Sequence, residues 1–226
     1  MEAASVLAGA TLHYFPLPGR GECVRLALVL SGQSWQDHRI VPKEWGEFKP
    51  STPWGSMPTL ELSDGTHLGQ ARSLMRFIGK ATGLYPTDAL AACRVDELMD
   101  AVDDLLQITN KVGQGKEQSE KEAERSKEAE SGVVANAFER IDRYIGLHGS
   151  EGHCVGSSLT VADLMVATLP PFVVSGFFDG VPPETIERYP SVQAVRKTVM
   201  ALPAVVAHYE ARGEAMSPVE KFLLKI

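Results

Sequence analysis

The chain has 226 residues, of which 44% are hydrophobic and 23% charged, with a formal net charge of -7 and a pI of about 5.4. This composition is typical of a globular protein, and the acidic balance argues against a general nucleic-acid binder, which carries a basic surface. No run of 18 apolar residues is present, and the first ten residues do not resemble a secretion signal. The three cysteines are odd in number and widely spaced, which indicates reduced thiols. We therefore expect a cytoplasmic protein without nucleic-acid or membrane partners.

The first 86 residues alternate strand and helix signals and predict a small α/β domain. Asp64-Gly65 is a hairpin-turn pair, and Gly83 stops the last helix of this part. Pro58 heads a strand, where its missing N–H does least harm and where its peptide bond can be cis. Strands are expected at residues 11–15, 37–41, 59–62 and 66–68, and helices at 22–32 and 70–82.

After residue 86 the strand signals largely vanish, and apolar residues at helical spacing predict an all-helical domain. Thr160 and Asp163 have the spacing of a capping box that opens a helix, and Pro170-Pro171 is expected to bend or end that helix. Residues 116–130 are almost wholly charged or polar, which indicates a solvated helix extension or a mobile excursion. The further helices are expected at 89–112, 133–147, 191–202 and 204–212. The chain thus divides into a first domain over 1–86 and a helical domain over 87–226.

Six features of the sequence occur in the order and spacing of a known family. They are YFPLPGRGECVRLAL, DHRIVPKEW, Lys49, PWGSMPTLEL, TVADL and YPSVQAVRKTVMALPAVVAHY. With them the chain resembles the cytosolic glutathione transferases over nearly its whole length. It is most similar to the sigma class, which includes glutathione-dependent prostaglandin D synthases and S-crystallins. The resemblance implies a thioredoxin-like domain, a helical domain that carries the electrophile pocket, a homodimer, and glutathione as co-substrate with no other cofactor.

Tyr14 matches the catalytic tyrosine of this family, and Arg20 matches an arginine that supports the site electrostatically. The thiol of glutathione is expected to titrate near ~8.5, so that only a small fraction is thiolate at neutral pH. A hydrogen bond to a charged group contributes ~1.5–3 kcal/mol, so one hydroxyl donor can supply much of the required stabilisation. Without the resemblance, a tyrosine at a strand end is more often a packing residue.

The resemblance places further glutathione contacts in the first domain. An extended peptide can pair with an exposed strand edge, and the free N–H groups of a helix start favour an anion. The implied contacts are Trp45 and Lys49 for the glycyl carboxylate, Gly55, Ser56, Met57 and Pro58 for the cysteinyl part, and Gln70 with Ala71 for the γ-glutamyl end.

Two of these positions depart from the family pattern. Ala71 stands where the family usually has a serine that binds the γ-glutamyl carboxylate, and Ser73 lies two residues further on. Ser56 stands where sigma enzymes often carry lysine. Losing one hydroxyl donor costs ~1–2 kcal/mol, or about tenfold in affinity, so we expect weaker glutathione binding.

Acidic residues recur along one face of the helix predicted at 89–112, and a solvated surface is their simplest interpretation. The resemblance adds two others. Asp104 matches an aspartate that reaches the glutathione amino group of the partner subunit. Asp100, Asp103 and Asp104 match a carboxylate cluster that binds magnesium in the prostaglandin synthase branch, although no metal is expected to be required.

Three functions remain open at this point. The first is conjugation of glutathione to small hydrophobic electrophiles. The second is isomerisation of a prostaglandin D type on the same site, which is disfavoured because residues 105–110 lack the tryptophan usual in that branch. The third is a non-catalytic, crystallin-like or ligand-binding protein, which Ala71 and the charged segment 116–130 motivate.

Overall fold

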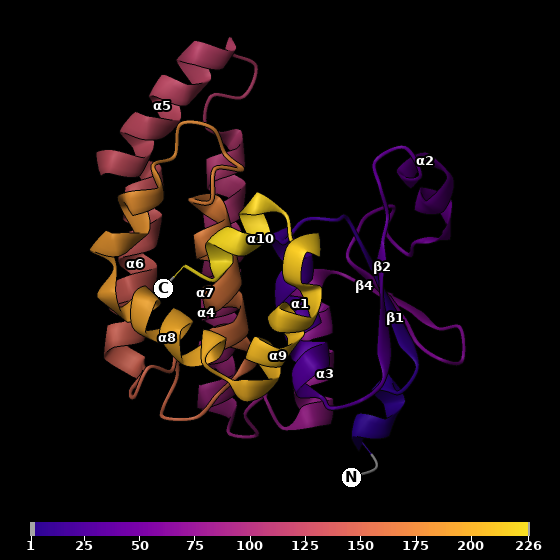
Figure 1. The fold of residues 1–226 in the computed structure, drawn as a ribbon. Helices are drawn as coiled ribbons and strands as arrows, with labels where there is room; N and C mark the ends of the chain where they lie inside the picture. Colours follow the sequence, from indigo (N-terminus) through magenta and orange to yellow (C-terminus); the bar gives the residue numbers. More distant parts are fainter. Residues whose placement is uncertain (1–2, 226) are drawn as a thin grey trace.

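The computed structural model describes residues 3–225, and its first part is built on a four-stranded sheet (Figure 1). The strands are β1 (Ala10–Tyr14), β2 (Trp35–Arg39), β3 (Thr59–Glu61) and β4 (His67–Gly69), in the order β2-β1-β3-β4. β1 pairs with β2 in parallel and with β3 antiparallel, and β3 pairs antiparallel with β4. This mixed sheet confirms the predicted α/β character.

Helices α1 (Gly19–Leu30) and α3 (Ala71–Thr82) lie between the sheet and the rest of the molecule, whereas α2 (Trp45–Phe48) lies at the outer side of the sheet (Figure 1). Short 3-10 helices occur at Ala3–Leu7 and Lys49–Ser51. The peptide bond between Met57 and Pro58 is cis. Gly83, with a φ of 79°, ends α3 as predicted, because a residue without Cβ adopts this left-handed conformation at little cost.

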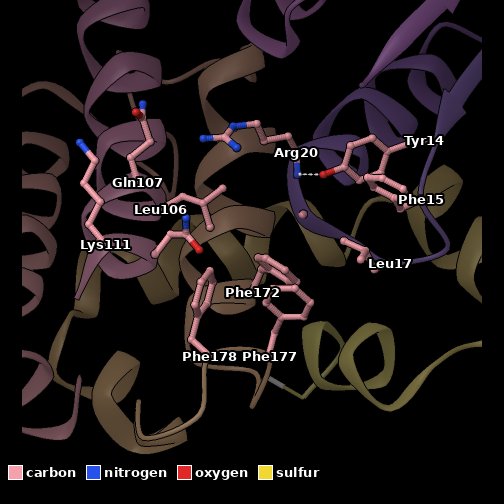
Figure 2. Close-up of a pocket in the computed structure, with 12 residues that line it drawn as sticks. Tyr14, Phe15, Leu17, Arg20, Leu106, Gln107, Lys111, Phe172, Phe177 and Phe178 are labelled. Atoms are coloured by element: carbon pink, nitrogen blue, oxygen red, sulfur yellow. Dashed lines mark hydrogen bonds between the residues drawn. The ribbon is translucent and has the colours of Figure 1, made fainter. Parts of the chain in front are cut away.

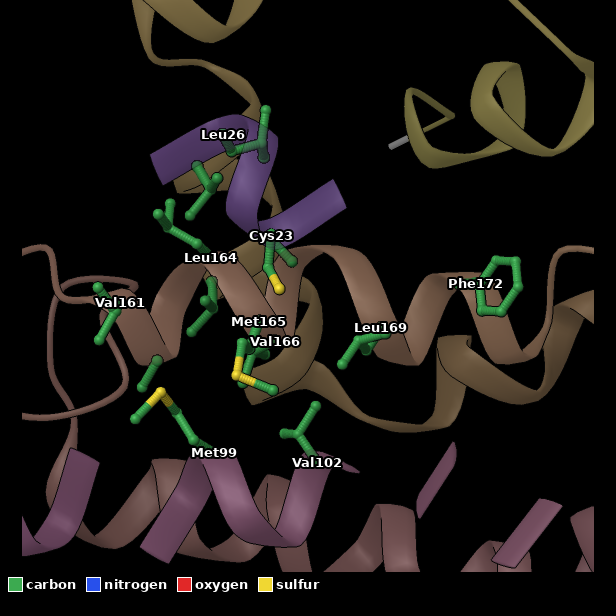
Figure 3. Close-up of a cluster of buried hydrophobic side chains, with 14 of the residues drawn as sticks. Cys23, Leu26, Met99, Val102, Val161, Leu164, Met165, Val166, Leu169 and Phe172 are labelled. Atoms are coloured by element: carbon green, nitrogen blue, oxygen red, sulfur yellow. The ribbon is translucent and has the colours of Figure 1, made fainter. Parts of the chain in front are cut away.

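The second part is wholly helical in its named elements, as predicted. It contains α4 (Ala89–Lys111), α5 (Gln118–Ser131), α6 (Val133–His148), α7 (Val161–Val173), α8 (Pro190–Met200), α9 (Pro203–Arg212) and α10 (Pro218–Leu223), with 3-10 helices at Pro183–Arg188 and Gly213–Ala215. One continuous hydrophobic core joins the two parts. In Figure 3, Cys23 of α1 points toward Met165 of α7, which in turn faces Met99 and Val102 of α4. The proposed boundary at residues 86–87 lies in the segment between α3 and α4 and stays a prediction.

Helix α7 confirms one prediction and corrects another. Its start carries the expected capping box, in which Asp163 accepts from the Thr160 N–H at 2.7 Å. Pro170-Pro171 was expected to bend or end the helix. It does not end it, because α7 continues through both prolines to Val173. Every residue of α7 is buried, so its packing offsets the hydrogen bonds that two prolines remove near its last turn.

The charged segment 116–130 also differs from its prediction. It forms α5 as a separate helix that packs along α6, and Arg125 and Ala129 on it are buried. The second strand runs over Trp35–Arg39 and not over 37–41, and α1 begins at Gly19, three residues earlier than expected. Among residues 3–225, no helix is both long and apolar enough to cross a lipid bilayer.

Candidate active site

Tyr14 is the last residue of β1, and its ring lies against the first turn of α1. The Tyr14 hydroxyl oxygen accepts a hydrogen bond from the Arg20 backbone N–H at 3.1 Å (Figure 2). A Cβ on Gly21 would lie 2.2 Å from Tyr14 Cδ1, and one on Gly19 would lie 2.7 Å from the hydroxyl. Gly19 and Gly21 therefore do more than start the helix, because their lack of side chains lets the tyrosine ring approach the backbone.

The Tyr14 hydroxyl is available as a hydrogen-bond donor. Burial raises the pKa of Tyr14, while the Arg20 N–H and the charges of Arg20 and Arg25 act in the opposite direction. The phenol thus stays neutral at physiological pH. Its oxygen already accepts from Arg20, and within residues 3–225 no group accepts its proton. The arrangement leaves one hydroxyl donor directed at whatever anion lies beside it.

The loop after Tyr14 is held by a buried arginine that the sequence interpretation missed. The Arg25 guanidinium donates to the carbonyl oxygens of Phe15 and Leu17 at 3.1 and 3.0 Å, and its carbon lies 5.6 Å from the centroid of the Tyr14 ring. Arg25 has no exposed surface, and it pairs with Glu22 at 2.9 Å and with Asp37 at 3.0 Å. Its spacing from Glu22 on one helix face was the only signal, and it does not distinguish a buried pair from a surface pair.

The Arg20 side chain reaches from α1 to α4. Its Nε donates to the nearly buried carboxylate of Asp103, whose other oxygen accepts from the Gln107 amide at 2.9 Å. This chain of contacts fixes the helical part against the first turn of α1. It also leaves Arg20 partly exposed between two cavities, which we call the polar cavity and the apolar cavity.

The polar cavity, of about 290 Å³, gathers most of the residues predicted to contact glutathione. Gln70 stands out because its φ of 72° is uncommon for a residue other than glycine and marks local strain next to a site. Ala71 begins α3 and is buried, while Ser73 is exposed and does not line the cavity. The lining consists of Arg20, Ser56, Met57, Pro58, Gln70, Ala71, Arg72, Asp103 and Gln107.

Five predicted residues lie outside this lining, namely Tyr14, Trp45, Lys49, Gly55 and Asp104. Trp45, on α2, is half-buried with its ring 5.9 Å from that of Phe15. Lys49 is exposed, and its side chain approaches Gly55, where an added Cβ would lie 3.4 Å from the lysine Cε. The sequence grouped Trp45, Lys49 and Gly55 with the cavity, and the structure places them along the segment that leads to it.

The acidic residues of α4 do not form a metal-ligand set within one chain. Asp103 pairs with Arg20, and Asp100 pairs with Arg72 at 2.6 Å. Asp104 is exposed, with no ion-pair or hydrogen-bond partner among the described residues. No group of three His, Cys, Asp or Glu residues in the described range has the arrangement of a metal site within one chain, and the magnesium role of Asp100, Asp103 and Asp104 between two subunits stays a prediction.

The apolar cavity, of about 490 Å³, lies on the other side of Arg20. Figure 2 shows Tyr14 and Arg20 on one side, Lys111 across from them, and three phenylalanines grouped along one wall. Two cations and no acidic residue line it. Its residues are Tyr14, Phe15, Leu17, Gly19, Arg20, Leu106, Gln107, Asn110, Lys111, Phe172, Phe177 and Phe178. The sequence interpretation named only Tyr14 and Arg20 from this set, since the others follow no motif with a chemical meaning.

Comparisons with known proteins identify the family of this chain. Residues 103–212 match the family model of the glutathione S-transferase C-terminal domain. The chain is 31% identical over 206 residues to the probable glutathione S-transferase 8 of Caenorhabditis elegans, with 90% of this chain and 96% of that protein covered. It is 30% identical over 213 residues to human hematopoietic prostaglandin D synthase, with the same coverage. The structure of rat hPGDS complexed with a quinoline matches with a TM-score of 0.77 and 26% identity, covering 91% of this chain and 98% of that one. The chain therefore belongs to the glutathione S-transferase family.

Proposed function

We propose that this protein is a sigma-like glutathione S-transferase that conjugates the glutathione thiolate to small hydrophobic electrophiles. The observation that carries the proposal is the Tyr14 hydroxyl, which accepts from the Arg20 N–H and keeps its own proton free beside the apolar cavity. A neutral phenol in a partly dry site donates to the thiolate and lowers the pKa of the thiol, so neither a metal nor another cofactor is needed. Arg20 adds a positive charge next to the same anion.

Glutathione would occupy the polar cavity with its sulfur directed at Tyr14. The Met57 backbone, within the loop Gly55–Pro58, would pair with the cysteinyl part, as an added strand pairs with a sheet edge. Gln70 and the start of α3 at Ala71 would hold the γ-glutamyl end. Trp45 and Lys49 would hold the glycyl carboxylate from the neighbouring segment.

We further propose a cytoplasmic homodimer. Asp104 is exposed and unpartnered within the described chain, which suits a carboxylate that binds the glutathione amino group in the partner subunit. Trp54 is 67% exposed and lies against Gly69, so a large apolar side chain stands uncovered near the polar cavity. Such exposed aromatic surface is typical of a protein interface.

A prostaglandin D-type isomerase on the same site is the second candidate. The 30% identity to the human synthase over 96% of that protein favours it. The lining of the apolar cavity argues against this candidate. Helix α4 ends with Lys111 and lacks the tryptophan that usually follows the aspartates in the prostaglandin synthase branch. An assay with a prostaglandin endoperoxide decides between the two, since the conjugating enzyme alone would leave that substrate unchanged.

Titration calorimetry with glutathione, followed by conjugation of 1-chloro-2,4-dinitrobenzene, tests the proposal. We expect binding in the micromolar to millimolar range and a glutathione-dependent increase in absorbance. Folded protein that gives no heat at millimolar glutathione would contradict both enzymes and support the non-catalytic, ligand-binding alternative. Binding without conjugation of any electrophile would contradict the transferase and leave the isomerase to be assayed.

A further inference from the structure

The charged helix α5 contacts the loop that forms the wall of the apolar cavity. We call residues 175–180, with the sequence SGFFDG, the aromatic loop. It follows α7 and supplies Phe177 and Phe178 to the cavity lining. Nothing in its sequence links it to the charged segment 116–130, some 50 residues earlier in the chain. The structure brings the two together through four contacts.

The first two contacts come from Arg125, in the middle of α5. Its guanidinium carbon lies 5.3 Å from the centroid of the Phe178 ring, and its Nη1 donates to the Asp179 carbonyl oxygen at 3.4 Å. Arg125 is 6% exposed, yet it pairs with no carboxylate within residues 3–225. A buried arginine is normally paired with an acid, because removing its charge from water is costly. Here the face of the Phe178 ring and the Asp179 carbonyl oxygen stand in for the missing carboxylate.

The other two contacts come from the first turns of α5. The Gln118 amide donates to the Asp179 carboxylate at 2.9 Å. Gly180 lies so close to α5 that a Cβ on it would stand 2.3 Å from the Glu122 carbonyl oxygen. Gly180 and Gly176 both have a φ of 87°, so the loop turns at each end in a conformation that favours glycine. The loop is therefore held in one position along α5.

On its other side the aromatic loop continues into the cavity wall. The ring centroids of Phe172 and Phe177 are 4.6 Å apart, and those of Phe177 and Phe178 are 5.2 Å apart. Phe178 is buried, whereas Phe177 is 45% exposed and stands at the edge of the cluster. Figure 2 shows the three rings together, facing the space between Leu106 and Leu17. Phe178 thus connects the arginine of α5 to the ring that meets the substrate.

We propose that α5 sets the electrophile specificity of the apolar cavity, with Arg125 as the positioning residue for Phe178 and through it for Phe177. The wall that results presents ring faces and edges, which favour planar aromatic electrophiles over linear aliphatic ones. Releasing Phe178 lets the wall rearrange, and the stacking surface is lost while the rest of the site stays intact. This proposal rests on the function proposed above.

The test compares two electrophiles on the same enzyme. The variants are Arg125→Met, which keeps the volume but removes the charge and the hydrogen bond, and Gln118→Ala. The control is Arg140→Met on α6, which replaces an exposed arginine without an ion pair among the described residues. The quantity is the ratio of kcat/KM for 1-chloro-2,4-dinitrobenzene to that for a linear alkenal. This ratio is independent of the fraction of folded enzyme, so a merely structural role does not move it.

We expect Arg125→Met to lower the ratio about five- to tenfold, which is the scale of one cation–π contact plus one aromatic pair. The change should appear as a higher KM for the aromatic substrate, with the Kd for glutathione within about twofold of the wild type. Gln118→Ala should lower the ratio by less, and Arg140→Met should leave it unchanged. An unchanged ratio in both Arg125→Met and Gln118→Ala overturns the proposal.

Two outcomes need a separate readout. If Arg125→Met does not fold, Gln118→Ala carries the test, and an unchanged ratio in it overturns the proposal. If the wild type conjugates neither electrophile, the proposed function has failed, and the affinity of the wall for 8-anilinonaphthalene-1-sulfonate tests the role of α5 alone. Weaker dye binding in Arg125→Met or Gln118→Ala than in Arg140→Met supports that role, and equal binding in all of them overturns it.

Discussion

The polar and apolar cavities share Arg20 and Gln107 but are built in different ways. The polar cavity is formed mostly by a loop and helix starts of the sheet region, and Asp103 and Gln107 of α4 complete it, with Asp103 ion-paired to Arg20. The apolar cavity lies between the segment Tyr14–Arg20, the end of α4 and the aromatic loop with the end of α7, and packing of the loop against α5 fixes one wall. The difference suggests that the first cavity binds one ligand through defined contacts, whereas the second selects ligands by shape.

The largest predicted effect follows from Arg25→Met, which disrupts the loop after Tyr14 that lines the apolar cavity. The change leaves Glu22, with no exposed surface, without its cation, and it removes two hydrogen bonds to the Phe15–Leu17 loop. We expect the free energy of unfolding to fall by about 3–5 kcal/mol, as when a buried pair loses one partner. Urea denaturation measures it. Arg143→Met on α6 is the exposed control, and equal losses in both variants would show that Arg25 has no special role.

The next largest effect is expected for Tyr14→Phe, which leaves the fold and both cavities in place but removes one hydroxyl. A hydrogen bond to an anion is worth ~1.5–3 kcal/mol, so kcat/KM should fall about 10- to 100-fold at pH 6.5. The loss should shrink toward high pH, where the thiol ionises without help. Steady-state rates over a pH series check this, and a loss that is constant across the series would mean that Tyr14 acts only in packing.

Ala71→Ser tests the polar cavity separately from the apolar cavity. It restores a hydroxyl at the first residue of α3, next to Gln70, in a position that lines the cavity. We expect glutathione to bind up to about tenfold more tightly, by up to ~1.4 kcal/mol, with no change in selectivity between electrophiles. Calorimetry measures the gain. Ser73→Ala, outside the lining, should change nothing, and a weaker affinity in Ala71→Ser would place the γ-glutamyl end elsewhere.

A histidine cluster lies beneath α2, on the outer face of the sheet. His13 Nδ1 lies 2.9 Å from His38 Nδ1, and His13 Nε2 lies 3.0 Å from the Glu61 carboxylate. His67 approaches the same carboxylate at 3.7 Å, and the ring of Phe48 lies 4.7 Å from that of His13. Burial, the largest cause, lowers the pKa of His13, and His38 and His67 act in the same direction against Glu61. Neutral His13 fits these contacts as a donor to Glu61 and an acceptor from His38.

The smallest predicted effect is a dependence of stability on pH that arises on this side of the molecule. Because the pKa of His13 is lower in the folded state, the unfolded chain takes up the proton first. Stability is therefore full above the unfolded value of ~6.5 and decreases as the pH falls toward the folded pKa. His13→Gln should flatten this decrease between pH 7.5 and 5.5 in thermal unfolding, whereas His148→Gln, outside the cluster, should not. If the stability of the wild type and of His13→Gln decreased in parallel with falling pH, the histidine cluster would not be the source of the pH dependence.

The sequence predicted the polar cavity far better than the apolar one, for a physical reason. Arg20, Met57 and Gln70 occur in short segments whose spacing is fixed by a strand edge or a helix start, so a motif identifies them. Phe177 and Phe178 line the apolar cavity because a loop folds back along α5, and Phe172 lines it from the end of α7. Neither periodicity nor spacing records a contact between residue 125 and residue 178.

Burial accounts for the remaining errors. Arg125 lies in a segment that was predicted to be solvated, and the role of Arg25 was missed, because a sequence does not show which charged residue finds partners inside. Pro170-Pro171 reads as a helix end, because the packing that keeps α7 helical comes from α1, α4 and α8, which are distant in sequence. The capping box at Thr160 was predicted correctly, since all its atoms lie within four residues.

The central claim is that the Tyr14 hydroxyl stabilises the thiolate of bound glutathione, and its most direct test is a titration. The ultraviolet absorbance of the thiolate is followed from pH 5 to 9 with glutathione bound to the wild type and to Tyr14→Phe. We predict that the thiol pKa lies about two units below its free value of ~8.5 in the wild type and returns most of the way in the variant. The same pKa in both proteins would contradict the account.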